Sequence, residues 1–204
     1  MYKVAYVDDD YSAFSDYKKR LARKEIELNF VNNCISLEDI LEWVMDNTIE
    51  CLLVDHKLTA KYAFQGTNVV AYINNQLPDL PCIILTNYPE DSEGDNLVVK
   101  NLIFDRNVMS EDDISPFTDI IKQSAEVFRN RLKNHLNEYE NLLVKKNNGQ
   151  ISALEEEQFL HLYKLLRAYG EVDDIATELL KPDVDKKIDA LIEKLDHYID
   201  IKKK

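Results

Sequence analysis

An apolar run near the amino terminus ends in three acids, in the stretch Lys3-Val4-Ala5-Tyr6-Val7-Asp8-Asp9-Asp10. Two further runs each end in one polar residue, Cys51-Leu52-Leu53-Val54 in Asp55 and Cys82-Ile83-Ile84-Leu85 in Thr86. Short apolar runs that are rich in β-branched residues and separated by helical patterns are typical of buried parallel strands. The three runs therefore predict strands of one parallel sheet, each with a polar residue at its carboxyl end.

The polar residues at these strand ends are expected to share one crevice, because the carboxyl ends of the strands line the ligand crevice of an open parallel sheet. Carboxylates of Asp8, Asp9 and Asp55 that meet there would repel one another. A hard divalent cation such as Mg²⁺ would relieve this repulsion, since it prefers oxygen ligands. The sequence therefore predicts a Mg²⁺ site with the hydroxyl of Thr86 beside it.

Strand and helix patterns alternate from residue 2 to about residue 110, which predicts a doubly wound α/β sheet. Ser36 and Asp39 form a capping-box pattern at the start of one expected helix, and another is expected to end before Pro78. The polar segment 87–96 predicts only a short fourth helix. The other expected elements are a helix over 11–23, a strand over 26–31 and a fifth strand over 101–104.

This combination resembles the receiver domain of bacterial two-component response regulators. The resemblance rests on the acidic pair Asp8-Asp9 after the first strand, on Asp55 after the third, and on the Pro-hydrophobic-Thr stretch Leu80-Pro81-Cys82-Ile83-Ile84-Leu85-Thr86. Gly66 also lies near the position of a glycine that this family often has before its third helix. The resemblance covers roughly residues 1–130 and implies a five-stranded parallel sheet of the receiver or flavodoxin-like type, in a domain spanning residues 1–115.

The resemblance also implies the role of each site residue. Asp55 would accept a phosphoryl group from a histidine kinase or a phosphotransfer protein. Asp9 would bind Mg²⁺ directly, Asp8 would act through water, and the backbone carbonyl of Lys57 would supply another ligand. Thr86 would bond a phosphoryl oxygen. Such a protein is a signalling switch of a phosphorelay, and it is not expected to be an enzyme.

One position departs from the family pattern. Receivers usually carry a lysine at the end of the fifth strand, and Arg106 stands near that position here. Lys100 is the other nearby cation, but it follows Thr86 too closely to leave room for a full fourth helix. Arginine keeps the positive charge and changes its reach and hydrogen-bonding geometry. Arg106 is therefore predicted to serve in the site, with an altered coupling between phosphoryl group and conformational switch.

Residues 116–204 carry no strand pattern and predict an all-α module that begins with an extended helix. Its apolar residues recur at spacings close to the 3.5-residue repeat of a coiled coil, at Ile121, Ala125, Phe128, Leu132, His135, Tyr139 and Leu142. This seam predicts either packing against the later helices or a homodimeric coiled coil. Later helices are expected from the capping pair Ser152 and Glu155 to Gly170, over 172–180, and over 184–199.

Composition narrows the possible partners. The net charge of −13 argues against nucleic acid and against an anionic membrane surface, since both attract basic proteins. No apolar stretch is long enough to span a bilayer, and charged residues follow the first strand directly, so neither a membrane anchor nor a secretory signal is expected. The chain has three cysteines without metal-ligand spacing, and two lie in strand patterns. We therefore expect reduced thiols, a cytoplasmic location and an output that acts on protein.

Two other functions compete with the phosphorylated receiver. Haloacid-dehalogenase-like phosphatases also carry an Asp-x-Asp after the first strand, as Asp8 and Asp10 do, and a threonine after a later strand. They need a further lysine and an acidic pair that are hard to place after Lys100, and they leave Asp55 unexplained. A pseudo-receiver, which keeps the fold as a binding module without being phosphorylated, is favoured by the unusual fifth strand and the short fourth helix.

Overall fold

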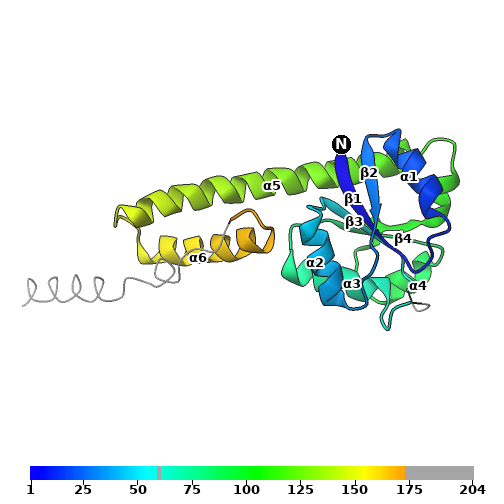
Figure 1. Cartoon of the computed structure of the whole chain (residues 1–204), viewed down its shortest axis with the longest axis horizontal. Coiled ribbons are helices and arrows are strands. Elements are labelled where there is room, and N and C mark those ends of the chain that lie inside the picture. Colours follow the sequence, from blue (N-terminus) through cyan, green and yellow to red (C-terminus); the bar gives the residue numbers. More distant parts are fainter. Residues whose placement is uncertain (59–60, 173–204) are drawn as a thin grey trace, which may run out of the picture.

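The computed structural model describes residues 1–58 and 61–172, and its first part is a five-stranded sheet with helices on both faces (Figure 1). All strand pairs are parallel, in the order β2-β1-β3-β4-β5. The strands are β1 (Tyr2–Val7), β2 (Ile26–Phe30), β3 (Cys51–Val54), β4 (Cys82–Thr86) and β5 (Ile103–Asp105). The predicted doubly wound parallel sheet is confirmed.

Two apolar cores lie on the two faces of this sheet. Ile40, Val44 and Ile73 pack from α2 and α3 against one face, and Phe14 and Phe117 pack from α1 and the start of α5 against the other. The helices are α1 (Phe14–Ala22), α2 (Leu37–Asp46), α3 (Gly66–Gln76), α4 (Pro89–Gly94), α5 (Ser115–Asn147) and α6 (Ala153–Ala168). Helices on both faces bury β3 and β4 completely, which leaves the strand ends as the accessible edge.

Two element boundaries differ from the sequence prediction for identifiable physical reasons, and two predicted features are present. Helix α1 begins later than predicted, because Asp10 accepts hydrogen bonds from the backbone and hydroxyl of Ser12 and holds a turn there. The fifth strand also starts later, since residues Lys100–Leu102 form a 3₁₀ turn, η1. The predicted capping box of Ser36 and Asp39 is present, and α4 is short, as predicted.

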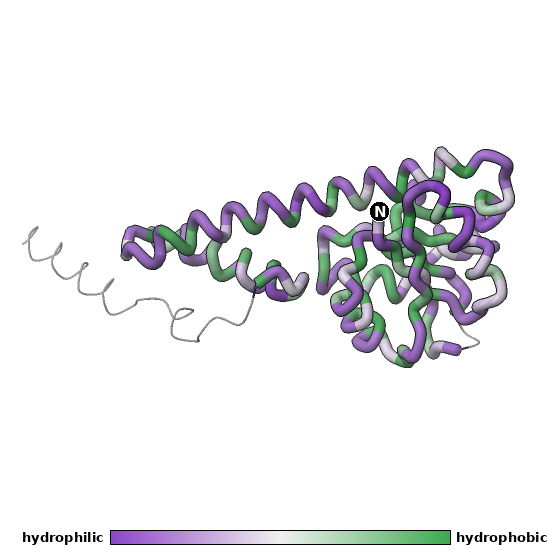
Figure 2. Tube along the Cα trace, turned by 45° about the horizontal axis from the view of Figure 1, so that its top comes forward, coloured by the Kyte–Doolittle hydropathy of each residue, from purple (hydrophilic) through white to green (hydrophobic). Residues whose placement is uncertain are grey.

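Helix α5 continues from the sheet far beyond it, with a length of 33 residues or about 50 Å (Figure 1). Its apolar residues recur among hydrophilic ones (Figure 2). Ile121 and Phe128 are buried in the two sheet cores and Ala125 between them is also buried, whereas Tyr139 and Leu142 are buried against α6. This seam is thus packed within the chain along much of its length, and a homodimeric coiled coil stays a prediction. The division at residue 115 also stays a prediction, because α5 packs in both parts.

Helix α6 folds back along α5 to form a helical hairpin. Gly149, with φ of +66°, follows the end of α5. A capping box of Ser152 and Glu155 starts α6, as the sequence predicts. The rings of Tyr139 and Phe159 stack with centroids 5.2 Å apart. Except for residue 172, the helices predicted over 172–180 and 184–199 lie outside the described residues. None of the helices in the described part of the chain has the length and hydropathy needed to cross a bilayer.

Candidate functional site

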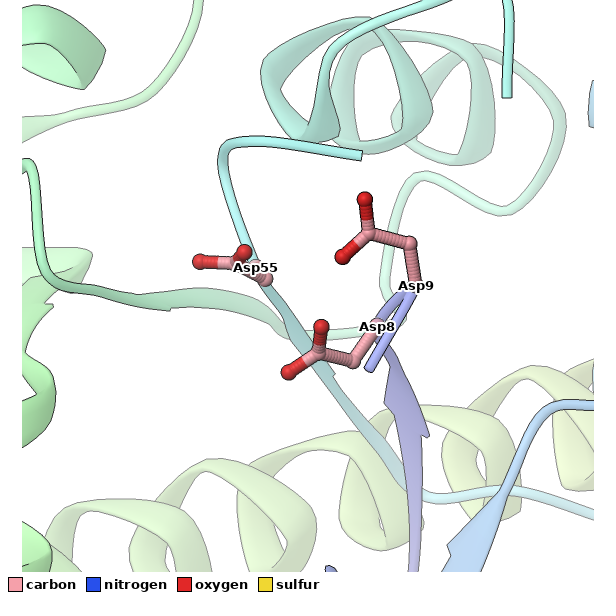
Figure 3. Close-up of side chains that lie close together, drawn as sticks. All are labelled: Asp8, Asp9 and Asp55. Atoms are coloured by element: carbon pink, nitrogen blue, oxygen red, sulfur yellow. The ribbon is translucent and has the colours of Figure 1, made fainter. Parts of the chain in front are cut away.

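Three carboxylates meet at the carboxyl ends of β1 and β3. These strands are adjacent and pair Val7 with Val54, and the backbone N–H of Asp55 donates to the carbonyl of Val7 at 2.8 Å. Asp8, Asp9 and Asp55 each offer a carboxylate oxygen, and these oxygens lie within 4.8 Å of one another (Figure 3). The parallel sheet therefore brings together the three acids that the sequence assigned to one crevice.

The carboxylate of Asp8 is buried and accepts three hydrogen bonds. Its Oδ1 accepts the backbone N–H of Asp10 at 3.0 Å, and its Oδ2 accepts the hydroxyl of Tyr6 and a guanidinium N–H of Arg106. Burial raises the pKa of the Asp8 carboxyl, and the bonds from Tyr6 and Asp10 and the charge of Arg106 oppose this shift. Asp8 is thus positioned rigidly at the base of the site.

The carboxylate of Asp55 is also nearly buried, with 7% of the residue exposed. Its Oδ1 lies 2.9 Å from Nη2 of Arg106, and the hydroxyl of Thr86 hydrogen-bonds to its side chain. Burial raises the pKa of Asp55, while Arg106 and Thr86 oppose the shift. Asp55 is therefore a nearly buried carboxylate that is flanked by a cation and a hydroxyl.

Gly66 allows helix α3 to start close to the backbone of Asp55. Its N–H donates to the carbonyl of His56 at 2.8 Å, and α3 starts there directly against the end of β3. A Cβ at this position would lie 1.9 Å from the carbonyl oxygen of Asp55. Glycine is required at this point because any side chain would collide with the backbone of the candidate acceptor.

The two candidate cations of the sequence lie in different places. Arg106 follows β5 and contacts both Asp8 and Asp55, whereas Lys100 is exposed and pairs with Glu93 at 2.8 Å. The geometry thus brings Arg106, and not Lys100, to the carboxylates. The side chain of Lys57 points to the rim, where Nζ lies 3.2 Å from the centroid of the Tyr88 ring. The metal-ligand role of its backbone carbonyl stays a prediction.

Sequence reasoning missed Tyr6 as a site residue and treated it only as part of an apolar strand. The available signal was its position two residues before Asp8, which puts both side chains on the same side of β1. His56 is buried beside the site, 3.8 Å from the carboxylate of Asp95, and Asp95 accepts the hydroxyl of Thr67 at 2.6 Å. These contacts tie the loop after β3 to the short α4 region.

The donor set fits Mg²⁺. Carboxylate oxygens are the ligands that this ion prefers, and two oxygens on one Mg²⁺ lie at most about 4.2 Å apart. The spread of 4.8 Å among Asp8, Asp9 and Asp55 needs only a small contraction, or one bridging water, to meet that limit. Asp9 is less buried than the other two and is best placed to meet a hydrated ion.

We expect Asp55→Asn to raise the melting temperature of the metal-free protein at pH 7. Burial raises the pKa of Asp55 above its ordinary value of 3.8, so the folded state favours the protonated acid. The stability that the protonated Asp55 contributes is fully present below its ordinary pKa, and it is lost as the pH rises through the raised pKa of the folded state. The advantage of the variant should therefore shrink as the pH falls toward 4. Thermal unfolding in a chelator at several pH values measures this, and an advantage independent of pH would contradict it.

Comparison with known proteins supports the fold assignment. Neither the protein-family models nor the curated protein sequences contain a match. Among solved structures, the signal receiver domain of an HD-domain-containing protein from Pseudomonas fluorescens is 14% identical, with a TM-score of 0.50 over 64% of this chain and 90% of that one. NtrX from Brucella abortus is 13% identical, with a TM-score of 0.50 over 67% of this chain and 30% of that one.

A CheY-like response regulator receiver domain protein from Methanospirillum hungatei is 16% identical, with a TM-score of 0.49 over 64% of this chain and 98% of that one. At these identities the likeness concerns the fold alone. The sheet order and the helices on its two faces are those of a response-regulator receiver domain, as the sequence resemblance predicted. The long α5 and α6 follow this fold.

Proposed function

We propose that this chain is the phosphoacceptor of a two-component phosphorelay and that Asp55 receives the phosphoryl group. The observation that carries the proposal is the convergence of Asp8 and Asp9 on the Asp55 carboxylate, with Thr86 and Arg106 in contact with that carboxylate. The donor would be a phosphohistidine of a histidine kinase or of a phosphotransfer protein. The receiver fold supports this class of donor.

The proposed reaction transfers one phosphoryl group between two proteins. An oxygen of Asp55 attacks phosphorus, a P–O bond forms, and the P–N bond to the donor imidazole breaks. The electron pair of that bond stays on the imidazole, which takes up a proton. Asp8, Asp9 and Asp55 would hold a Mg²⁺ ion, which would supply positive charge to offset that of the phosphoryl oxygens. Thr86 and Arg106 lie against Asp55 and would donate hydrogen bonds to the transferred phosphoryl group. The transfer therefore needs no further catalytic side chain.

We propose that output passes through protein contacts of the helices after the sheet. Helix α5 packs at one end against the sheet and at the other against α6, so one rigid element spans from the receiver fold to the hairpin. A change at the sheet can thus bias the arrangement of the hairpin. The charge of −13 disfavours DNA as the target. The partner would be a protein or a second copy of this chain.

The proposal predicts that incubation with acetyl phosphate and Mg²⁺ adds one base-labile phosphate to the intact chain. Asp55→Asn should abolish this mass increase and leave the circular dichroism spectrum unchanged. Asp46→Asn is a matched control, because Asp46 is an exposed aspartate outside the site and its loss should leave labelling intact. Undiminished labelling of Asp55→Asn would remove the proposed acceptor.

The proposal also predicts a Mg²⁺ site of modest affinity, since Mg²⁺ retains much of its water and takes few protein ligands. Added Mg²⁺ should raise the melting temperature by mass action, and Asp9→Asn should remove most of that rise. Asp16→Asn, which changes an exposed aspartate on α1, should respond as the parent does. If Asp9→Asn responds to Mg²⁺ like the parent, Asp9 is not a ligand.

One observation bears on each competing function. A phosphatase of the Asp-x-Asp type would need Asp10 in the site, but Asp10 is exposed and its carboxylate is bound to Ser12. This disfavours the phosphatase. The pseudo-receiver is favoured by the ion pairs of Arg106, because a cation that already neutralises Asp8 and Asp55 lowers the need for Mg²⁺. Absence of labelling by every phosphodonor and kinase would support it.

A further inference from the structure

We propose that Arg106 is a tethered cation that competes with Mg²⁺ for the carboxylates of this site and must release them before the metal binds. The proposal concerns regulation of the acceptor site and rests on the proposed function. It assigns to one side chain the control over when the site takes up metal.

The competition follows from the position of a single nitrogen. Nη2 of Arg106 lies 2.9 Å from Oδ2 of Asp8 and 2.9 Å from Oδ1 of Asp55. This nitrogen therefore bridges the acid after β1 and the acid after β3, as a shared cation would. Its side chain is only 15% exposed, so water screens these contacts poorly.

Asp8 already accepts three hydrogen bonds, and its carboxylate can accept about four. Oδ1 takes the N–H of Asp10, and Oδ2 takes both the hydroxyl of Tyr6 and the guanidinium of Arg106. A cation or water placed between Asp8 and Asp55 would need the position that Nη2 of Arg106 holds. The bonds from Tyr6 and Asp10 come from β1 and the turn after it, so the contact with Arg106 is the one that can yield without moving the backbone.

The guanidinium is also imperfectly held. Within the described residues, Nε of Arg106 is buried and has no hydrogen-bond partner. A buried donor without a partner costs free energy, so the bridging arrangement is not the best that this side chain can reach. Movement of Arg106 toward solvent would let water bond Nε and would leave an oxygen of Asp55 free.

Electrostatics makes the two cations mutually exclusive at this place. A Mg²⁺ ion bound to Asp55 would lie within a few ångströms of Nη2, and like charges at that distance repel strongly in a poorly solvated site. Lysine in the same position would be a compact point charge without the planar fork. Arginine can reach Asp8 and Asp55 through one nitrogen and keep further donors for a phosphoryl oxygen once it has moved.

The test is the Mg²⁺ dissociation constant of the full chain, measured by isothermal titration calorimetry. Arg106→Met should bind Mg²⁺ at least about tenfold more tightly than the parent, because the competing charge is gone. Arg106→Lys should fall between the two, and it keeps the test valid if Arg106→Met fails to fold. Arg129→Met removes an ion-paired arginine on α5, remote from the carboxylates, and should match the parent.

Equal or weaker Mg²⁺ binding by both Arg106 variants would overturn the competition. Tighter binding by Arg129→Met as well would also overturn it, because the effect would then be one of net charge. If the parent shows no measurable binding and Arg106→Met does, the competition is upheld, because Arg106 then outcompetes Mg²⁺ over the concentrations titrated. Phosphate labelling of Asp55 is a separate measurement, so a failure here leaves the acceptor role to be judged by that result.

Discussion

Gly66→Ala is expected to destabilise the fold severely and to disturb the candidate acceptor site at the same time. The added Cβ would lie 1.9 Å from the carbonyl oxygen of Asp55 and 2.9 Å from Cγ1 of Val54, so the backbone of β3 or α3 has to move. Overpacking of this kind costs about 3 kcal/mol or more of unfolding free energy. Urea denaturation of the parent and the variant measures the loss.

The matched control is Gly94→Ala, in the short helix α4. A Cβ at Gly94 meets no atom within 4 Å, and alanine suits a helix better than glycine. This variant should be as stable as the parent or up to about 1 kcal/mol more stable. Equal urea midpoints for Gly66→Ala and the parent would show that α3 does not start against Asp55 in solution.

Phe159→Ala is expected to loosen the hairpin and leave the receiver fold intact. Phe159 is fully buried, stacks on Tyr139 and lies under the ammonium group of Lys146. Removal of a buried phenylalanine ring costs about 3–5 kcal/mol. Because the sheet cores do not include Phe159, amide hydrogen exchange should become at least about a hundredfold faster in α6 and stay unchanged in β1, β3 and β4.

Leu154→Ala supplies the control for this experiment. Leu154 is in the same helix but is 76% exposed, so its truncation should change neither exchange rate nor melting temperature by a measurable amount. Loss of protection across the sheet in Phe159→Ala would mean that the hairpin and the receiver fold unfold as one cooperative unit.

The sequence was sufficient to predict the class of the fold and to predict which strand each of the candidate site residues follows. Asp8, Asp9, Asp55 and Thr86 could be assigned to one crevice because each follows a buried strand directly, and parallel strands end at one edge. The same reasoning located Arg106 near the fifth strand. It could not give the bridging contacts of Arg106, since those depend on side-chain reach and on which acids are buried.

The partner of the α5 seam was likewise undetermined by the sequence. A 3.5-residue spacing predicts a buried stripe and does not identify what covers it. In the structure the cover changes along the helix, from the sheet cores at Ile121 and Phe128 to α6 at Tyr139 and Leu142. Asp79, between α3 and β4, also connects the sheet domain with α5, because its carboxylate pairs with Arg131 and with His135. Long-range contacts of this kind have no local signature.

The location of the phosphate after labelling tests the central claim most directly. The chain, labelled with acetyl phosphate and Mg²⁺, is reduced with borohydride so that an acyl phosphate is converted to a stable product, and is then digested with trypsin. Cleavage after Lys24 and Lys57 places Asp55 in peptide 25–57, and cleavage after Lys3 and Lys18 places Asp8, Asp9 and Asp10 in peptide 4–18. We predict modification of Asp55 in peptide 25–57 alone. Modification of peptide 4–18 at Asp8, or of neither peptide, would contradict the assignment of Asp55 as the phosphoacceptor.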